Sequence, residues 1–100
     1  MKQGFVYMMS NKNRNVIYIG VTNDIETRIL QHKRGTGSVF TSKYNCKYLI
    51  YYEYFWDILN AIEREKQLKN WHREWKLNLA KTSNPELIDL SSEWFDETEI

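Results

Sequence analysis

Two short apolar runs separated by a polar stretch constrain the fold of this chain more than any other feature of its sequence. The first run is Phe5–Met9, and the second, Val16–Val21, is rich in β-branched residues. Both runs have the length and composition of β-strands. Residues 11–14 between them are polar and typical of a turn, so the sequence predicts an antiparallel hairpin with a four-residue loop.

A four-residue loop also predicts which residues face each other across the hairpin. It pairs Ser10 with Asn15 and, further along the strands, Tyr7 with Tyr18. Residues directly opposite each other share one face of the sheet, with Cβ atoms about 5 Å apart. We therefore expect the two tyrosines to lie side by side.

The segment after the hairpin carries the signals of a short helix. Asn23 is expected to be its N-cap, with Glu26 three residues later as the capping-box partner. We expect the helix to end at about Lys33 and to be followed by a flexible polar loop over residues 34–38.

Two cations border the apolar stripe of this expected helix. Ile25, Ile29 and His32 recur at helical spacing, and Arg28 lies four residues before His32. We expect Arg28 and His32 to lie at the edge of the buried face.

The rest of the body predicts one more strand and two more helices. Residues 47–55 have the aromatic and branched content of a strand, and Asp57 is expected to cap a helix over Ile58–Trp71. A further helix from Arg73 to about Lys81 is stopped by Asn84-Pro85. These elements predict an α/β (α+β) fold, with a three-stranded antiparallel sheet flanked by helices.

The charges are segregated along the chain. Residues 1–81 hold all 14 Lys and Arg and 7 of the 13 acids, a net charge of +7, whereas the other six acids follow Lys81. A body this basic favours a polyanionic partner, because neutralising phosphates releases counterions. We predict a domain over residues 1–82 and an acidic tail over residues 83–100. This tail either mimics phosphate over the basic site or is a solvated end with a few packed apolar residues.

Composition excludes several classes of protein. No apolar run approaches the roughly 20 residues that span a bilayer, and the N-terminus lacks the pattern of a signal peptide. Cys46 is the single cysteine, which excludes an intrachain disulfide and a cysteine-based zinc site, and we expect it to be buried without a role. We expect a cytoplasmic protein with no membrane partner and no small-molecule cofactor.

Glu65 interrupts the apolar stripe of the helix expected over residues 58–71. Burying a carboxylate without compensation costs several kcal/mol. Either a salt bridge to Arg28 or another base compensates Glu65, or the carboxylate is a hard oxygen ligand for Mg²⁺.

In combination, these residues resemble the GIY-YIG nuclease superfamily. The matching residues are Phe5-Val6-Tyr7, Tyr18-Ile19-Gly20, Arg28, His32 and Glu65. The steps of eleven residues from Tyr7 to Tyr18, ten to Arg28 and four to His32 are similar to those of homing endonucleases of this type. The resemblance covers about residues 4–80 and is closest to small, single-domain bacterial members related to the N-terminal nuclease module of the DNA-repair excinuclease.

The resemblance implies a metal-dependent endonuclease that hydrolyses phosphodiester bonds in DNA, in DNA repair or in the processing of structured DNA. It favours DNA over RNA, and the sequence leaves both substrates open. It implies that Tyr7 is the base acting on water, that Tyr18 orients it, and that Glu65 binds Mg²⁺ or Mn²⁺. It also implies that Arg28 and His32 favour the phenolate of Tyr7 and hold the scissile phosphate.

The chain departs from the family pattern at two positions. Val21 stands where many relatives place a lysine after YIG, so we expect another base such as Lys43 to contact the phosphate. Asn78 is the candidate for the asparagine that the family places beyond the metal-binding glutamate. The implied substrate-binding residues are Gly20, Lys43 and Asn78.

Two other functions remain open from the sequence. The chain could be a nucleic-acid-binding module that keeps this fold but does not cut, with salt-sensitive affinity. It could also be a protein-interaction domain in which the tyrosines, Trp71, Trp75 and Trp94 form an interface, and it would then have no affinity for DNA at moderate salt.

Overall fold

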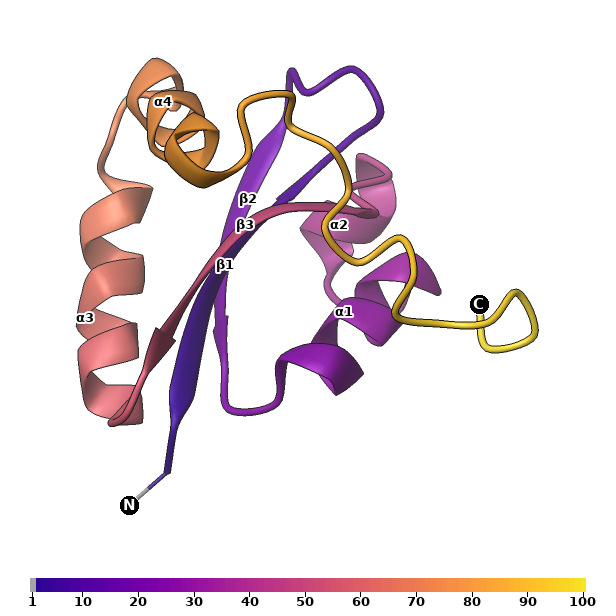
Figure 1. Ribbon diagram of the computed structural model, residues 1–100, viewed down its shortest axis with the longest axis horizontal. Helices are drawn as coiled ribbons and strands as arrows, with labels where there is room; N and C mark the ends of the chain where they lie inside the picture. The colour runs from indigo at the N-terminus through magenta and orange to yellow at the C-terminus, as the bar shows by residue number, and fades with distance from the viewer. Residues whose placement is uncertain (1) are drawn as a thin grey trace.

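The computed structural model describes residues 2–100, so Met1, the first residue of the predicted domain, lies outside the described part. Three antiparallel strands, β1 (Gly4–Ser10), β2 (Ile17–Thr22) and β3 (Tyr48–Phe55), form one sheet in the order β2-β1-β3 (Figure 1). The helices are α1 (Ile25–Lys33), α2 (Val39–Lys43), α3 (Ile58–Lys69) and α4 (Arg73–Ser83). The predicted α+β fold, a three-stranded antiparallel sheet flanked by helices, is confirmed.

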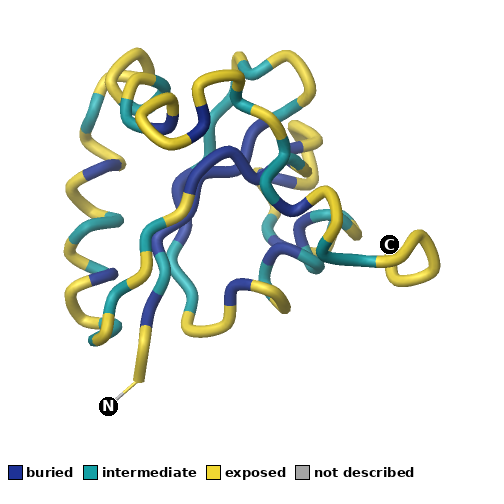
Figure 2. The backbone as a smooth tube through the Cα atoms, in the orientation of Figure 1, coloured by how far each residue is buried: buried dark blue, intermediate teal, exposed yellow. Residues whose placement is uncertain are grey.

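The central strand β1 separates two apolar clusters, one on each face of the sheet. Successive side chains of a strand point to opposite faces, so Val6 and Met8 join one cluster and Tyr7 and Met9 the other. The first cluster packs against α3 and α4 through Ala61, Leu68 and Ala80. The second packs against α1 through Ile25 and Ile29. Figure 2 shows the buried residues gathered along the strands between the two helical layers.

The predicted hairpin register is wrong by two residues. Tyr7 pairs with Gly20 and Ser10 pairs with Ile17, because the loop between the strands has six residues rather than four. The side chain of Asn11 holds this wider loop: its Oδ1 accepts hydrogen bonds from the backbone N–H groups of Asn15 and Val16. A shift of two keeps every side chain on its face, so Tyr7 and Tyr18 still share one face of the sheet.

The region between β2 and β3 differs from the prediction in two details. The N-cap of α1 is Asp24 rather than Asn23, and its carboxylate accepts a hydrogen bond from the backbone N–H of Thr27. The residues after the polar loop form α2, a five-residue helix that the sequence did not predict. Ser38 caps α2 by accepting a hydrogen bond from the backbone N–H of Thr41.

Helix α3 begins after the predicted cap Asp57 and ends at Lys69, two residues before the predicted end at Trp71. An ion pair ties it to β3: Arg64 Nε and Nη2 donate to the carboxylate of Glu53 at 2.9 and 3.0 Å. Tyr51 Oη donates to the same carboxylate at 2.6 Å. No helix within residues 2–100 combines the length and the apolar character needed to cross a bilayer.

The residues after α4 run back across the molecule and lie along β3 toward α1 (Figure 1). Asn84 Nδ2 donates to the carbonyl oxygens of Ile50 and Ile88, and Leu90 N–H donates to Leu49 O at 2.7 Å. Further apolar residues of the tail, Trp94 and Phe95 among them, pack against the cluster on the α1 face. The tail is thus docked on the body through part of its length.

Candidate active site

Tyr7 lies on the central strand with its ring directly against the backbone of β2. A Cβ atom added to Gly20 would lie 2.3 Å from Tyr7 Cζ and 2.4 Å from Tyr7 Oη, well inside van der Waals contact. Gly20 therefore provides the space in which the phenol lies. The observed pairing of Tyr7 with Gly20 explains why these two residue types belong together at this point of the hairpin.

Two side chains of α1 meet the hydroxyl of Tyr7. His32 Nε2 lies 2.8 Å from Tyr7 Oη, and Arg28 Nε donates to the same oxygen at 3.3 Å. Tyr7 and His32 are buried, whereas Arg28 is half-buried, and its Nη1 donates to Gln31 Oε1 at 2.9 Å. The helical spacing of Arg28 and His32 thus brings both residues to one tyrosine, with the arginine on the more exposed side.

Burial keeps the tyrosine and the histidine neutral. It raises the pKa of Tyr7 to about 12, and the hydrogen bond from Arg28 only partly offsets this. Burial, together with the charge of Arg28, lowers the pKa of His32 to about 4. In the free protein Arg28 lowers the pKa of Tyr7 as expected, but neutral His32 adds no charge, and desolvation of the phenol outweighs the effect of Arg28.

Tyr18 lies beside this group rather than directly opposite Tyr7. The ring centroids of Tyr18 and Tyr7 are 6.3 Å apart, and those of Tyr18 and His32 are 5.6 Å apart. Phe40 of α2 stacks on the outer side of Tyr18 with a centroid separation of 5.8 Å. Tyr18 therefore packs against His32 and Phe40, and its hydroxyl is not a partner of Tyr7 in the described structure.

Glu65 lies on α3, which packs against the face of the sheet opposite to α1. Its charge contributes to raising the pKa of Tyr7, as a nearby anion does, and its side chain is only 15% exposed. Lys69 Nζ lies 3.2 Å from Glu65 Oε2, so the base that compensates the carboxylate is Lys69 and not Arg28. Within residues 2–100, no group of three or more His, Cys, Asp or Glu side chains is arranged to hold a metal ion.

Three residues of the site were missed by sequence reasoning, and all lie in or beside α2. Thr41 Oγ1 lies 2.9 Å from His32 Nδ1, and Ser38 Oγ lies 2.8 Å from Thr41 Oγ1. A Cβ on Gly37 would lie 2.1 Å from His32 Nδ1, so this segment packs directly on the imidazole. The N-cap signal of Ser38 was present in the sequence, but a five-residue helix is too short for a periodic apolar pattern.

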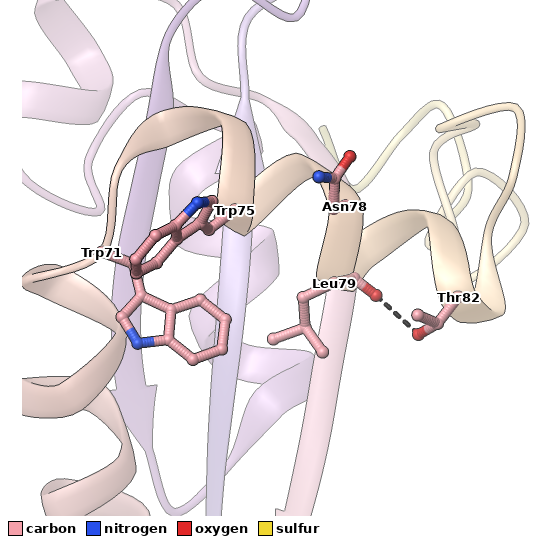
Figure 3. Close-up of a pocket in the computed structure, with 5 residues that line it drawn as sticks. All are labelled: Trp71, Trp75, Asn78, Leu79 and Thr82. Carbon is pink, nitrogen blue, oxygen red and sulfur yellow. Dashed lines mark hydrogen bonds between the residues drawn. The ribbon is translucent and has the colours of Figure 1, made fainter.

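The remaining residues named by the resemblance lie outside this cluster. Lys43 is exposed on α2, with its ammonium 5.3 Å from the ring centroid of Tyr44. Val21 packs into the apolar cluster on the α3 face. Asn78 lies on α4 at an open apolar pocket of about 340 Å³ between Trp71, Trp75, Leu79 and Thr82 (Figure 3).

A family model described as the GIY-YIG catalytic domain matches residues 3–78. A UPF0213 protein of Staphylococcus haemolyticus is 33% identical over 81 residues, which cover 81% of this chain and 98% of that protein. A UPF0213 protein of Staphylococcus saprophyticus is 33% identical over 79 residues, or 79% of this chain and 95% of that protein. No solved structure matches the chain significantly.

The match covers β1, β2, α1 and α3, the elements that carry Tyr7, Tyr18, Arg28, His32 and Glu65. Such a domain is of the nuclease type and implies a nucleic acid as substrate. The chain therefore belongs to the GIY-YIG family, and residues 3–78 are its catalytic domain.

Proposed function

We propose that this protein is a metal-dependent endonuclease that hydrolyses phosphodiester bonds in DNA. The observation that carries the proposal is the hydrogen-bonded group of Tyr7, His32 and Arg28, which is built over Gly20 inside a GIY-YIG catalytic domain. DNA repair or the processing of structured DNA is the cellular role that we propose, in the cytoplasm. The net charge of +7 on residues 1–81 supports a phosphate-rich substrate.

The donors present fit Mg²⁺ or Mn²⁺ held by a single carboxylate. Mg²⁺ takes one or two carboxylates and fills the rest of its shell with water and substrate phosphate, so a site without a carboxylate cluster suits it. Glu65 is the candidate ligand, and in the free protein Lys69 neutralises it. When bound, the ion supplies positive charge beside the phosphate oxygens as negative charge builds up on them.

In the proposed reaction, Tyr7 passes a proton from water to His32. At a pKa of about 12 the phenol is not a base at neutral pH, so it must lose its own proton while it gains another. Water gives a proton to Tyr7 Oη as its oxygen forms a bond to phosphorus, and the proton of Tyr7 moves to His32 Nε2 at 2.8 Å. The phosphorus–oxygen bond to the leaving strand breaks, and that oxygen takes a proton from solvent. Because its pKa is about 4, His32 is neutral at neutral pH and Nε2 has a free lone pair for this proton, which the imidazolium returns to solvent after each turnover.

Access to Tyr7 requires movement of Arg28. The tyrosine is buried, and Arg28 covers its hydroxyl from the more exposed side. A phosphate is a stronger partner for a guanidinium than a neutral phenol, since the hydrogen bonds are charge-assisted. We propose that Arg28 turns to the scissile phosphate when substrate binds and so uncovers Tyr7.

The first test is cleavage by the parent protein and by Glu65→Gln. Labelled single-stranded, duplex and branched DNA, and RNA, are each incubated with Mg²⁺, Mn²⁺ or EDTA. We expect cleavage only with metal and a fall of about 10²- to 10³-fold for Glu65→Gln, because metal charge stabilisation contributes several kcal/mol. Lys66→Gln, an exposed change on the same helix, is the matched control and should cut at nearly the parent rate.

A second variant, Tyr7→Phe, tests the proton path and should lower the rate by about 10²- to 10⁴-fold while DNA binding persists. Parent-like cleavage by Tyr7→Phe would remove Tyr7 from the reaction, and parent-like cleavage by Glu65→Gln would remove the metal assignment.

A non-cleaving nucleic-acid-binding module is the second candidate function. Two observations favour it: Tyr7 is fully buried, and Lys69 already pairs with Glu65. Salt-sensitive binding that is equal in the parent and Glu65→Gln, without cleavage in either metal, would select this candidate.

A further inference from the structure

Two hydroxyl side chains lie behind His32, on the side away from Tyr7. Thr41 Oγ1 is 2.9 Å from His32 Nδ1, and Thr41 is only 1% exposed. Ser38 Oγ is 2.8 Å from Thr41 Oγ1 and also accepts the backbone N–H of Thr41 at 3.0 Å. The imidazole is therefore held at both nitrogens, by a phenol on one side and a hydroxyl chain on the other.

The hydrogen atoms along this series of hydrogen bonds can be assigned by starting from Arg28, which can only donate. A guanidinium only donates, so Tyr7 Oη accepts from Arg28 Nε; His32 Nε2 is the other partner of Tyr7 Oη among residues 2–100, and we assign the phenolic proton to it. Nε2 must then carry the lone pair and Nδ1 the proton, which is donated to Thr41 Oγ1. Thr41 Oγ1, which accepts from Nδ1, is then free to donate its own proton to Ser38 Oγ at 2.8 Å, and within residues 2–100 no buried polar side-chain atom lacks a partner.

The other tautomer breaks this sequence of donors and acceptors. With a proton on Nε2, both Arg28 and His32 would point donors at Tyr7 Oη, and the phenolic proton would lose its acceptor. An unpaired buried donor costs about 1–3 kcal/mol. Gly37 packs on the same ring, since a Cβ at this position would stand 2.1 Å from Nδ1, and Thr41 Oγ1 is the hydrogen-bond partner of that nitrogen among residues 2–100.

We infer that Thr41 is a positioning residue of the site: it holds His32 in the tautomer with the proton on Nδ1, so that Nε2 is a free acceptor aimed at the hydroxyl of Tyr7. Ser38 orients Thr41 in the same way. The tautomer is inferred from the hydrogen bonds of the protein without substrate. Its use in catalysis rests on the proposed function, in which His32 takes the proton of Tyr7. A hydroxyl in this place fixes the ring without adding charge, so the imidazolium formed in each turnover readily returns its proton.

The test compares Thr41→Val, which removes the acceptor, with Thr41→Ser, which keeps it. All proteins carry His72→Gln, so that His32 is the only histidine, and ¹⁵N NMR of the imidazole reports its tautomer at neutral pH. We expect the parent and Thr41→Ser to show the proton on Nδ1, and Thr41→Val to show a mixture of tautomers. The cleavage rate should fall about 10- to 100-fold in Thr41→Val and recover to within a few-fold in Thr41→Ser.

The groups that face His32 and titrate or carry charge are Tyr7, Tyr18 and Arg28, and none of them is altered in this series. Thr36→Val, a change of the same chemistry at an exposed position of the neighbouring loop, is the control and should change neither readout. A parent with the proton on Nε2, or a Thr41→Val variant with parent tautomer and parent rate, would overturn the inference. If the tautomers are as expected but no nucleic acid is cleaved, the result supports the effect of Thr41 on the His32 tautomer. It then counts only against the proposed nuclease activity.

Discussion

Two glycines set how closely the reacting rings approach the backbone. Gly20 lies against the phenol of Tyr7 and Gly37 against the imidazole of His32, and at both positions a Cβ would overlap the ring. This close packing keeps water from the pair, and burial moves the two pKa values apart, to about 12 for Tyr7 and about 4 for His32. Both residues are therefore neutral over a wide range of pH, and this pair carries no charge in the core until a proton moves from Tyr7 to His32.

The low pKa of His32 predicts a specific loss of stability in acid. In the unfolded chain His32 has a pKa of about 6.5, so between pH 6.5 and 4 the unfolded state binds more protons than the folded state. The free energy of unfolding should therefore fall as the pH drops from 7 to 4.5, by about 2 kcal/mol from this residue. Urea denaturation at both pH values measures it.

The matched protein for this measurement is His32→Gln, in which the titrating group is gone. Its unfolding free energy should fall about 2 kcal/mol less than that of the parent over the same pH interval. Equal losses in the two proteins would show that His32 has the same pKa in the folded and unfolded chains, so that burial does not keep the imidazole neutral in acid.

At the scale of elements, the orientation of α3 decides where Glu65 lies. Arg64 is its immediate neighbour on the helix and forms the two-bonded ion pair with Glu53 of β3. Burial alone would raise the pKa of Glu53, but the hydrogen bonds from Arg64 and Tyr51 hold it below its ordinary value. This ion pair holds α3 against β3 at the residue directly before Glu65.

Removing this anchor should destabilise the fold more than a surface change does. Arg64→Met leaves the partly buried carboxylate of Glu53 without its cation, which we expect to cost about 2 kcal/mol in urea denaturation. Lys66→Met, an exposed change on the same helix, should stay within about 0.5 kcal/mol of the parent. A similar small effect for both variants would show that packing of Ala61 and Leu68 alone fixes α3.

The elements that the sequence predicted correctly are those whose signal is local. Strands β1, β2 and β3 are short apolar runs, and Asp57 caps α3 as expected. The hairpin register depends on a side chain, Asn11, that bonds into its own loop, which composition does not reveal. Helix α2 was missed because five residues are too few for a periodic pattern.

The candidate site also has features that the sequence predicted and features that it could not predict. Motif spacing named Tyr7, Arg28 and His32, which the fold brings into one hydrogen-bonded group. It could not give their protonation, because burial is a property of the packed structure rather than of the spacing. It also could not reveal Thr41, whose hydroxyl reaches His32 only after α2 has formed.

At the scale of the whole molecule, the tail completes the core on the α1 face. Leu90 and Trp94 pack against the cluster that contains Tyr7, and Asp89 accepts a hydrogen bond from Lys33 at 2.6 Å and one from Leu49 N–H. Asp89 therefore holds the tail on the body and does not act as a phosphate mimic over the basic site. The boundary between a domain of residues 1–82 and a tail of residues 83–100 remains a prediction.

Truncation tests that boundary directly. A chain that ends at Pro85 loses the packing of Leu90, Trp94 and Phe95, and we expect its unfolding free energy to fall by about 3 kcal/mol or more. A chain that ends at Asp96 loses only exposed residues and should change by less than about 1 kcal/mol. Equal stability of the parent and the chain that ends at Pro85 would show that the body is stable without the tail beyond residue 85.

The docked tail also affects when the core becomes covered as the chain is synthesised. Ribosomes release the chain from its N-terminus, so the strands and the motif residues emerge well before Leu90 and Trp94. Until Leu90 and Trp94 follow, the apolar cluster around Tyr7 lies open to water on one side, where a chaperone or a protease can reach it. A nascent chain therefore buries Tyr7 fully only after the segment beyond α4 has emerged.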